Sequence, residues 1–178
     1  MMKRIVSGLL ALLLLVMCGC SGGSAQTNKN TMYVVDGAYN LTPQEYIELI
    51  NSSIEGQNAG YPLIPDWDED ALYLAIDNRF IQLSLKINDK GKITDIHYHW
   101  EIKNQTQTDA AYFMAGLTIG MAVGAENSQS VYDALEMTKT GVSSHINECD
   151  KNGNHFYFIS YGYGKYNDLH IYPIEKTE

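Results

Sequence analysis

The sequence predicts an α+β domain with two layers: an antiparallel sheet of about five to six strands in two meanders, and three helices mainly on one face of it. Three observations predict this class. Several segments alternate apolar and polar residues, as half-buried strands do. Three other segments place apolar residues at helical spacing. Helices and strands also occupy separate stretches, and the length of 178 residues suits a single domain, which we place at residues 31–178.

The first helix should begin just after Thr42. Thr42 is the N-cap, Pro43 occupies the first helical position, and Glu45 completes a capping box. The helix should end at Gly56. Its predicted buried stripe is Tyr46, Leu49, Ile50 and Ile54.

Three strands should follow, separated by short turns. The first carries Leu72, Leu74 and Ile76, the second spans residues 81–87, and a hairpin turn at residues 88–91 leads to the third. In the third strand, one face carries Ile96, Tyr98, Trp100 and Ile102. The opposite face carries Asp95, His97, His99 and Glu101. This alternation predicts a sheet with one buried side and one wet side.

The second half should contain two helices and three strands. Residues 109–125 form an apolar helix, and Ser130 and Asp133 offer a capping box for the next helix, which Gly141 should end. Strand candidates lie near residues 142–149, 156–161 and 169–174. The apolar helix carries a row of small residues, Gly116, Gly120 and Gly124. At about 16 residues its apolar run is shorter than the roughly 20 of a membrane span, which favours a buried helix.

This order of elements resembles the small helix-plus-sheet modules of other bacterial lipoproteins and the β-lactamase-inhibitor-protein fold. The resemblance is one of outline, carried by no motif residues, and it implies architecture alone.

The first 19 residues predict a signal peptide. Lys3 and Arg4 precede an apolar run at residues 5–17, which is too short for a spanning helix of about 20 residues. The run ends in Met17-Cys18-Gly19-Cys20, which resembles the lipobox of bacterial lipoproteins, since a small residue stands directly before a cysteine. The resemblance implies cleavage after Gly19, a diacylglycerol thioether on Cys20 and often a further acyl chain, such as palmitate, on the new N-terminus. An ordinary secretory signal is the alternative.

Such processing predicts a domain held by lipid on the extracytoplasmic face of the cell membrane, or at an outer membrane if the host has one. Residues 20–30 would form the lipidated end and a flexible tether. Without residues 1–19 the chain keeps 10 basic and 21 acidic residues, a net charge of −11. That balance argues against a nucleic-acid partner, because phosphates require a basic face. Cys149 would be the one remaining thiol, which more often is a small buried hydrophobe than a nucleophile.

Two groups of side chains are candidates for binding. His97 and His99 point to one side and could hold a metal ion, with Glu101 or one of His145, His155 and His170 as a third ligand. The alternation favours a solvated polar face instead. Tyrosine is abundant, with 13 in the chain, and Tyr161, Tyr163 and Tyr166 near the predicted loop 162–168 are candidates for an exposed recognition surface. The alternative is that the tyrosines reflect only the preference of strands for aromatic residues. The acidic tract at residues 66–70 and the segment 150–154 lack the ligand spacing of calcium loops.

The sequence contains no serine-hydrolase elbow, zinc-protease motif or phosphate-binding loop. We therefore expect a non-enzymatic lipoprotein, without a cofactor other than its covalent lipid, that binds a protein or a cell-envelope glycan. One alternative is a metal-binding protein or metal-dependent hydrolase that uses His97, His99 and Glu101. A second is an inhibitor or immunity-type lipoprotein, which an acidic α+β domain of this size could be.

Overall fold

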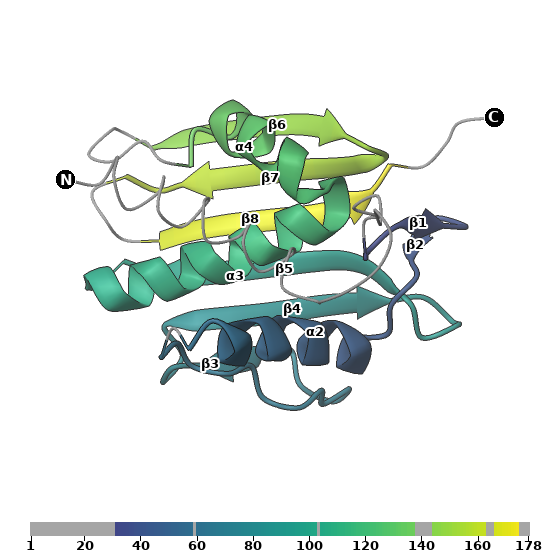
Figure 1. Ribbon diagram of the computed structural model, residues 1–178, viewed down its shortest axis with the longest axis horizontal. Helices are drawn as coiled ribbons and strands as arrows, with labels where there is room; N and C mark the ends of the chain where they lie inside the picture. Colours follow the sequence, from purple (N-terminus) through teal and green to yellow (C-terminus); the bar gives the residue numbers. More distant parts are fainter. Residues whose placement is uncertain (1–30, 59, 103, 138–143, 163–165, 175–178) are drawn as a thin grey trace, which may run out of the picture.

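The computed structural model describes residues 31–58, 60–102, 104–137, 144–162 and 166–174. Within them, three helices lie on one face of a six-stranded antiparallel sheet, with a two-stranded hairpin at one end (Figure 1). The elements are β1 (Val34–Val35), β2 (Ala38–Tyr39), α2 (Pro43–Gly56), β3 (Leu74–Ile76), β4 (Ile81–Ile87), β5 (Ile93–Glu101), α3 (Gln105–Val123), α4 (Ala125–Ala134), β6 (His145–Lys151), β7 (Asn154–Ser160) and β8 (Tyr166–Pro173).

The strand order is β3-β4-β5-β8-β7-β6, with every neighbouring pair antiparallel. It consists of two meanders, β3-β4-β5 and β6-β7-β8, that meet where β5 pairs with β8. The predicted α+β class, with two meanders and helices on one face, is confirmed. The central position of β5 and β8 places their outward-facing side chains in the middle of the sheet.

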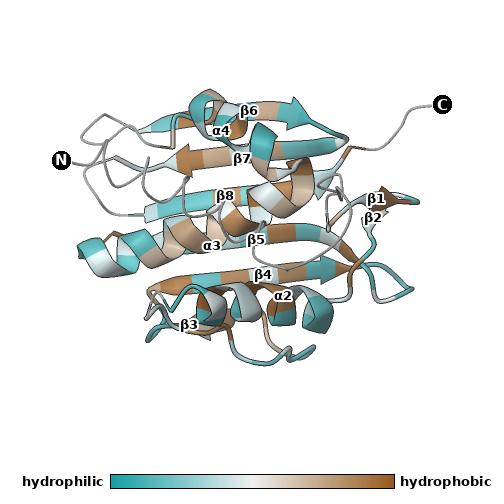
Figure 2. Cartoon of the chain, viewed as in Figure 1, coloured by the Kyte–Doolittle hydropathy of each residue, from teal (hydrophilic) through white to brown (hydrophobic). Residues whose placement is uncertain are grey.

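The hydrophobic core lies between the sheet and the helices. Helix α3 crosses the sheet over β5, and from Ala110 onward nearly all of its residues are buried. Figure 2 shows the same division along α3, whose first turns are hydrophilic and whose later part is apolar. Among the described helices, none combines the length and the hydropathy that a membrane crossing requires.

A buried cluster of hydroxyl groups joins α2, β5 and α3. The Tyr46 hydroxyl lies 2.7 Å from that of Tyr98 and 2.6 Å from Oγ1 of Thr118. All three side chains are fully buried, and Thr118 also donates to the carbonyl of Met114. Because a buried hydroxyl without a partner is costly, this cluster fixes how both helices sit on β5.

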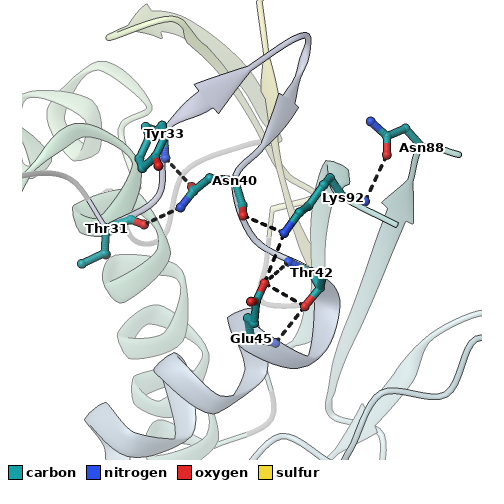
Figure 3. Close-up of polar contacts among 7 residues, drawn as sticks. All are labelled: Thr31, Tyr33, Asn40, Thr42, Glu45, Asn88 and Lys92. Carbon is teal, nitrogen blue, oxygen red and sulfur yellow. Dashed lines mark hydrogen bonds and ion pairs between the residues drawn. The ribbon is translucent and has the colours of Figure 1, made fainter. Parts of the chain in front are cut away.

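The start of α2 follows the predicted capping box (Figure 3). The backbone N–H of Thr42 donates to Oε2 of Glu45 at 2.7 Å, and the N–H of Glu45 donates to Oγ1 of Thr42. The bonds that the Thr42 backbone N–H and the Thr42 hydroxyl donate to the Glu45 carboxylate, together with Lys92, lower the pKa of Glu45. Lys92 also donates to the carbonyl of Asn40 at 2.9 Å, which ties the β1–β2 hairpin to the sheet.

The sheet differs from the prediction at two apolar positions. Leu72 is 90% exposed, because the ladder with β4 starts at Leu74, and the Leu72 carbonyl accepts a bond from Oγ of Ser84 instead of a backbone N–H. Ile87 is half-exposed at the end of β4, where the register against β5 shifts between Lys86 and Ile87. The β1–β2 hairpin was not predicted.

Helices α3 and α4 begin at other residues than the sequence predicted. Helix α3 begins at Gln105, four residues earlier than predicted, because Oδ1 of Asn104 caps it by accepting from the N–H of Gln107. Helix α4 begins directly after Gly124, whose φ of +85° ends α3. The predicted capping box at Ser130 is therefore wrong. Ser130 is an interior residue of α4, and its hydroxyl donates to the carbonyl of Asn127. The predicted end at Gly141 lies outside the described residues.

Candidate functional site

The face of the sheet opposite the helices is the candidate site, and we call it the open face. In Figure 1 the helices lie in front of the sheet, so the open face is turned away from the viewer. Residues paired across antiparallel strands share a face, and the register therefore defines its members. They are Gln82, Ser84 and Lys86 on β4; Asp95, His97, His99 and Glu101 on β5; Tyr166, Asp168, His170 and Tyr172 on β8; His155, Tyr157 and Ile159 on β7; and Ile146, Glu148 and Asp150 on β6.

The open face gathers four of the five histidines of the chain, and each lies beside a carboxylate. Strand alternation explains why they share a side, since each occupies an outward position of its strand. Paired residues then bring different strands together: His97 lies opposite His170, and His99 lies opposite Asp168. A line of imidazoles and carboxylates consequently runs across the middle of the sheet.

Asp168 is the centre of this line. Its Oδ1 lies 2.8 Å from Nε2 of His97 and 2.8 Å from Nδ1 of His99. A carboxylate can only accept, so both of these ring nitrogens carry hydrogen, and in a neutral ring the lone pair lies on Nδ1 of His97 and on Nε2 of His99. The residue is 8% exposed. Burial opposes its ionisation, but the bonds from the two histidines outweigh burial and hold the pKa of Asp168 far below its usual range.

The hydrogen bond to Asp168 also raises the pKa of His99. The ring of His99 stacks on Tyr166, with centroids 5.4 Å apart. The rings of His97 and His170 stack almost parallel, with centroids 3.9 Å apart and planes 8° apart. These contacts hold the three imidazoles in fixed orientations above the sheet.

Asp95 forms a second acidic centre at the other end of β5. Its Oδ2 lies 3.0 Å from Nζ of Lys86, and its Oδ1 lies 3.6 Å from Nδ1 of His170. Burial opposes the charge, but the neighbouring His170 and Lys86 prevail and lower the pKa of Asp95. Asp95 is therefore ionised at neutral pH.

The other side of the sheet stabilises this arrangement. Trp100 and Asn167 are paired neighbours that point into the core, directly behind His99 and Asp168. With the Asn167 amide oriented to satisfy its neighbours, its oxygen accepts from Nε1 of Trp100 at 3.1 Å. A bond between the same two strands therefore exists on each face of the sheet, which fixes the register of β5 against β8.

A separate corner of the open face lies where β6, β7 and β8 meet. His155 Nδ1 lies 2.6 Å from Oδ1 of Asp150, and His155 Nε2 lies 3.7 Å from Oε2 of Glu148. The imidazole faces the ring of Tyr172 at a centroid distance of 4.8 Å. A hollow of about 360 Å³ lies here, lined by Asp150, His155, Tyr172, Pro173 and Ile174.

The structure brings His97 and His99 together as predicted, but the group between them is the carboxylate of Asp168. Their nitrogens point at Asp168, and within the described residues no group of three or more His, Cys, Asp or Glu side chains is arranged to hold a metal ion. Glu101 shares their face and lies opposite Tyr166. The predicted alternation of β5 is confirmed.

The predicted tyrosines fall into three cases. Tyr161 is 49% exposed. Tyr166 is also exposed, but the prediction of a loop position is wrong, because Tyr166 begins β8 and pairs with Glu101. Tyr163 lies outside the described residues, as does the lipidation candidate Cys20. The thiol of Cys149 is half-buried against the core, and burial raises its pKa.

Sequence reasoning missed Asp168 and Tyr172 as parts of the site, and it considered His155 and His170 only as histidines that could complete a metal site. The signal was present, since Asp168, His170 and Tyr172 alternate with Leu169, Ile171 and Pro173, much as the β5 set alternates with its apolar residues. The missing information was which strand lies beside β5. Comparisons with protein-family models, with curated proteins and with solved structures found no match.

Proposed function

We propose that the protein is a bacterial lipoprotein, anchored through Cys20 on the extracytoplasmic side of a membrane, and that it acts by binding another protein through the open face rather than by catalysis. The anchor rests on the resemblance of Met17-Cys18-Gly19-Cys20 to a lipobox. The binding role rests on the open face. A net charge of −11 after processing would keep the domain away from anionic headgroups, so the lipid is its means of attachment.

The composition of the open face is the observation that carries the binding role. One face of the sheet buries the core, whereas the other presents tyrosine, histidine and isoleucine side chains among carboxylates. Ile146 is 60% exposed, and Tyr166 and Tyr172 are 40% and 38% exposed. Aromatic residues are enriched in protein interfaces because they provide a large contact area at low entropic cost.

The orientation of these side chains favours recognition further. Stacking and hydrogen bonds hold His97, His99 and His170 in place before any partner arrives. Side chains that are already ordered lose less entropy on binding, which improves affinity for a given area.

The anchor is tested on protein purified from native membranes. Intact mass should show a chain that begins at Cys20 and carries fatty acids, and a Cys20→Ser variant should leave the membrane fraction. An unprocessed Met1 terminus, or native protein without fatty acids, would refute this half of the proposal.

The binding role is tested by photo-crosslinking in cells. A photoreactive amino acid placed at Tyr166, on the open face, should yield a defined adduct with another protein. The matched position is Ser130, which is exposed on α4 on the opposite side of the sheet. Adducts that are absent at Tyr166, or identical from the two positions, would show that the open face is not the binding surface.

A further inference from the structure

We infer that the partner docks a basic surface on the open face, and that the hollow between β6, β7 and β8 takes one of its lysine or arginine side chains. This inference rests on the proposed function, since it identifies the chemistry of the protein that the open face would bind.

The charges of the open face favour a cationic partner. Among its described members five are carboxylates, Asp95, Glu101, Glu148, Asp150 and Asp168, and one is a lysine, Lys86. Asp95 and Asp168 are largely buried and paired with neighbours on the same face. Glu148 and Asp150 extend into solvent, with side chains 66% and 65% exposed. They are therefore the carboxylates that an approaching protein would meet first.

The hollow beside them has the chemistry of a site for a basic side chain. The Asp150 carboxylate, the imidazole of His155 and the ring of Tyr172 line it, together with the apolar side chains of Pro173 and Ile174. A lysine or arginine combines an alkyl stem, which packs on apolar walls, with a cationic head that pairs with carboxylates and lies over aromatic rings. At about 360 Å³ the hollow is at the small end of ligand pockets, which suits one side chain.

The electrostatics at the tyrosine agree with this assignment. Partial burial and the negative charges of nearby carboxylates, Glu148 first among them, raise the pKa of Tyr172. The same negative potential that disfavours a phenolate would favour a cation at this point.

Other occupants fit less well. A second copy of this chain, docked face to face by a two-fold axis, would bring together two faces that each carry an excess of carboxylates. The five adjacent strands β4-β5-β8-β7-β6 are seven to nine residues long and about 4.8 Å apart, so their face has a flat area of roughly 500–600 Å². This area is small for a stable interface, which buries about 800 Å² of accessible surface per partner, so we expect a transient complex.

The test uses the full-length mature lipoprotein in non-ionic detergent, with hexa-arginine, hexa-glutamate and chitotetraose as probes in a calorimetric titration. The variant Glu148→Gln/Asp150→Asn removes two charges beside the hollow. The matched control Asp66→Asn/Glu69→Gln removes two charges from the exposed acidic tract. Equal melting temperatures would show that both variants are folded.

We expect hexa-arginine to bind and to lose about fivefold in affinity in the first variant but less than about twofold in the control, because two exposed charge pairs contribute this much. Hexa-glutamate should not bind. Equal losses in the two variants would overturn the inference, since attraction would then follow net charge alone. Binding of chitotetraose that is lost in the first variant would also overturn it, in favour of a glycan site.

The crosslinked partner separates this inference from the proposed function. A Tyr166 adduct that hexa-arginine suppresses supports both. A Tyr166 adduct that persists in excess hexa-arginine overturns the basic-surface inference and leaves the binding role intact. Absence of a specific Tyr166 adduct refutes the binding role itself.

Discussion

Replacing Asp168 with asparagine would remove the charge from the acceptor that His97 and His99 share while keeping its size and one carbonyl oxygen. Two bonds of 2.8 Å change from charge-assisted to neutral at a site that is 8% exposed. Hydrogen bonds to charged groups contribute about 1.5–3 kcal/mol and neutral ones about 1 kcal/mol. A loss of about 1 kcal/mol per bond predicts that Asp168→Asn lowers the free energy of unfolding by about 2 kcal/mol.

The loss of stability caused by Asp168→Asn should become smaller both at low pH and at high pH. The native pKa of Asp168 is lowered, so its stabilisation is present above the unfolded value of 3.8 and is lost as the pH falls toward the native pKa. The native pKa of His99 is raised, so its contribution is full below the unfolded value of 6.5 and is lost as the pH rises through the native pKa. The difference between the wild type and the variant should therefore be largest between these two values.

Urea unfolding of both proteins at pH 2.5, 5.5 and 9 would measure this difference, with Asp66→Asn as an exposed control. NMR titration should also show a lower pKa of His99 in the Asp168→Asn variant. A difference below about 0.5 kcal/mol at pH 5.5, or one that stays constant across the three pH values, would refute the role of Asp168 as a shared charged acceptor.

Three further predictions concern the helices and the metal alternative. Tyr98→Phe should lower stability by about 1–2 kcal/mol in urea unfolding, because it removes a buried hydroxyl from its bonds, whereas Tyr172→Phe on the surface should cost less than about 0.5 kcal/mol. Equal costs would contradict the buried cluster. Gly124→Ala should cost about 1–3 kcal/mol, since φ is +85° where α3 meets α4; an unchanged melting temperature would argue against this backbone geometry. Zinc should leave the melting temperature unchanged, because the facing nitrogens of His97 and His99 are bound to Asp168; a concentration-dependent rise would favour the metal-binding alternative.

Much of the fold could be predicted because its signals are local. The capping box of Thr42 and Glu45 involves residues three apart, and the alternation along β5 needs one strand alone. These signals placed His97 and His99 on a wet face correctly. The β1–β2 hairpin has strands of two residues each, which are too short for any periodicity to appear.

The centre of the site could not be predicted for the opposite reason. Asp168 reaches His97 across 71 residues of sequence, through the pairing of β5 with β8. Both strands carry a plausible polar face, but any strand of the second meander could in principle have lain beside β5. Which strand pairs with β5 depends on how the helices pack on the sheet. No short segment of sequence contains that information.

The joining of the two meanders at β5 and β8 has a consequence for folding. Each meander is built from neighbouring hairpins, whereas the contact between Asp168 and the two histidines closes loops of 69 and 71 residues. Such distant contacts form late and slowly compared with local ones. A chain in which only one of the two meanders has formed would lack the line of imidazoles and carboxylates. A partner that binds the open face would therefore bind fully folded molecules and not partly folded ones.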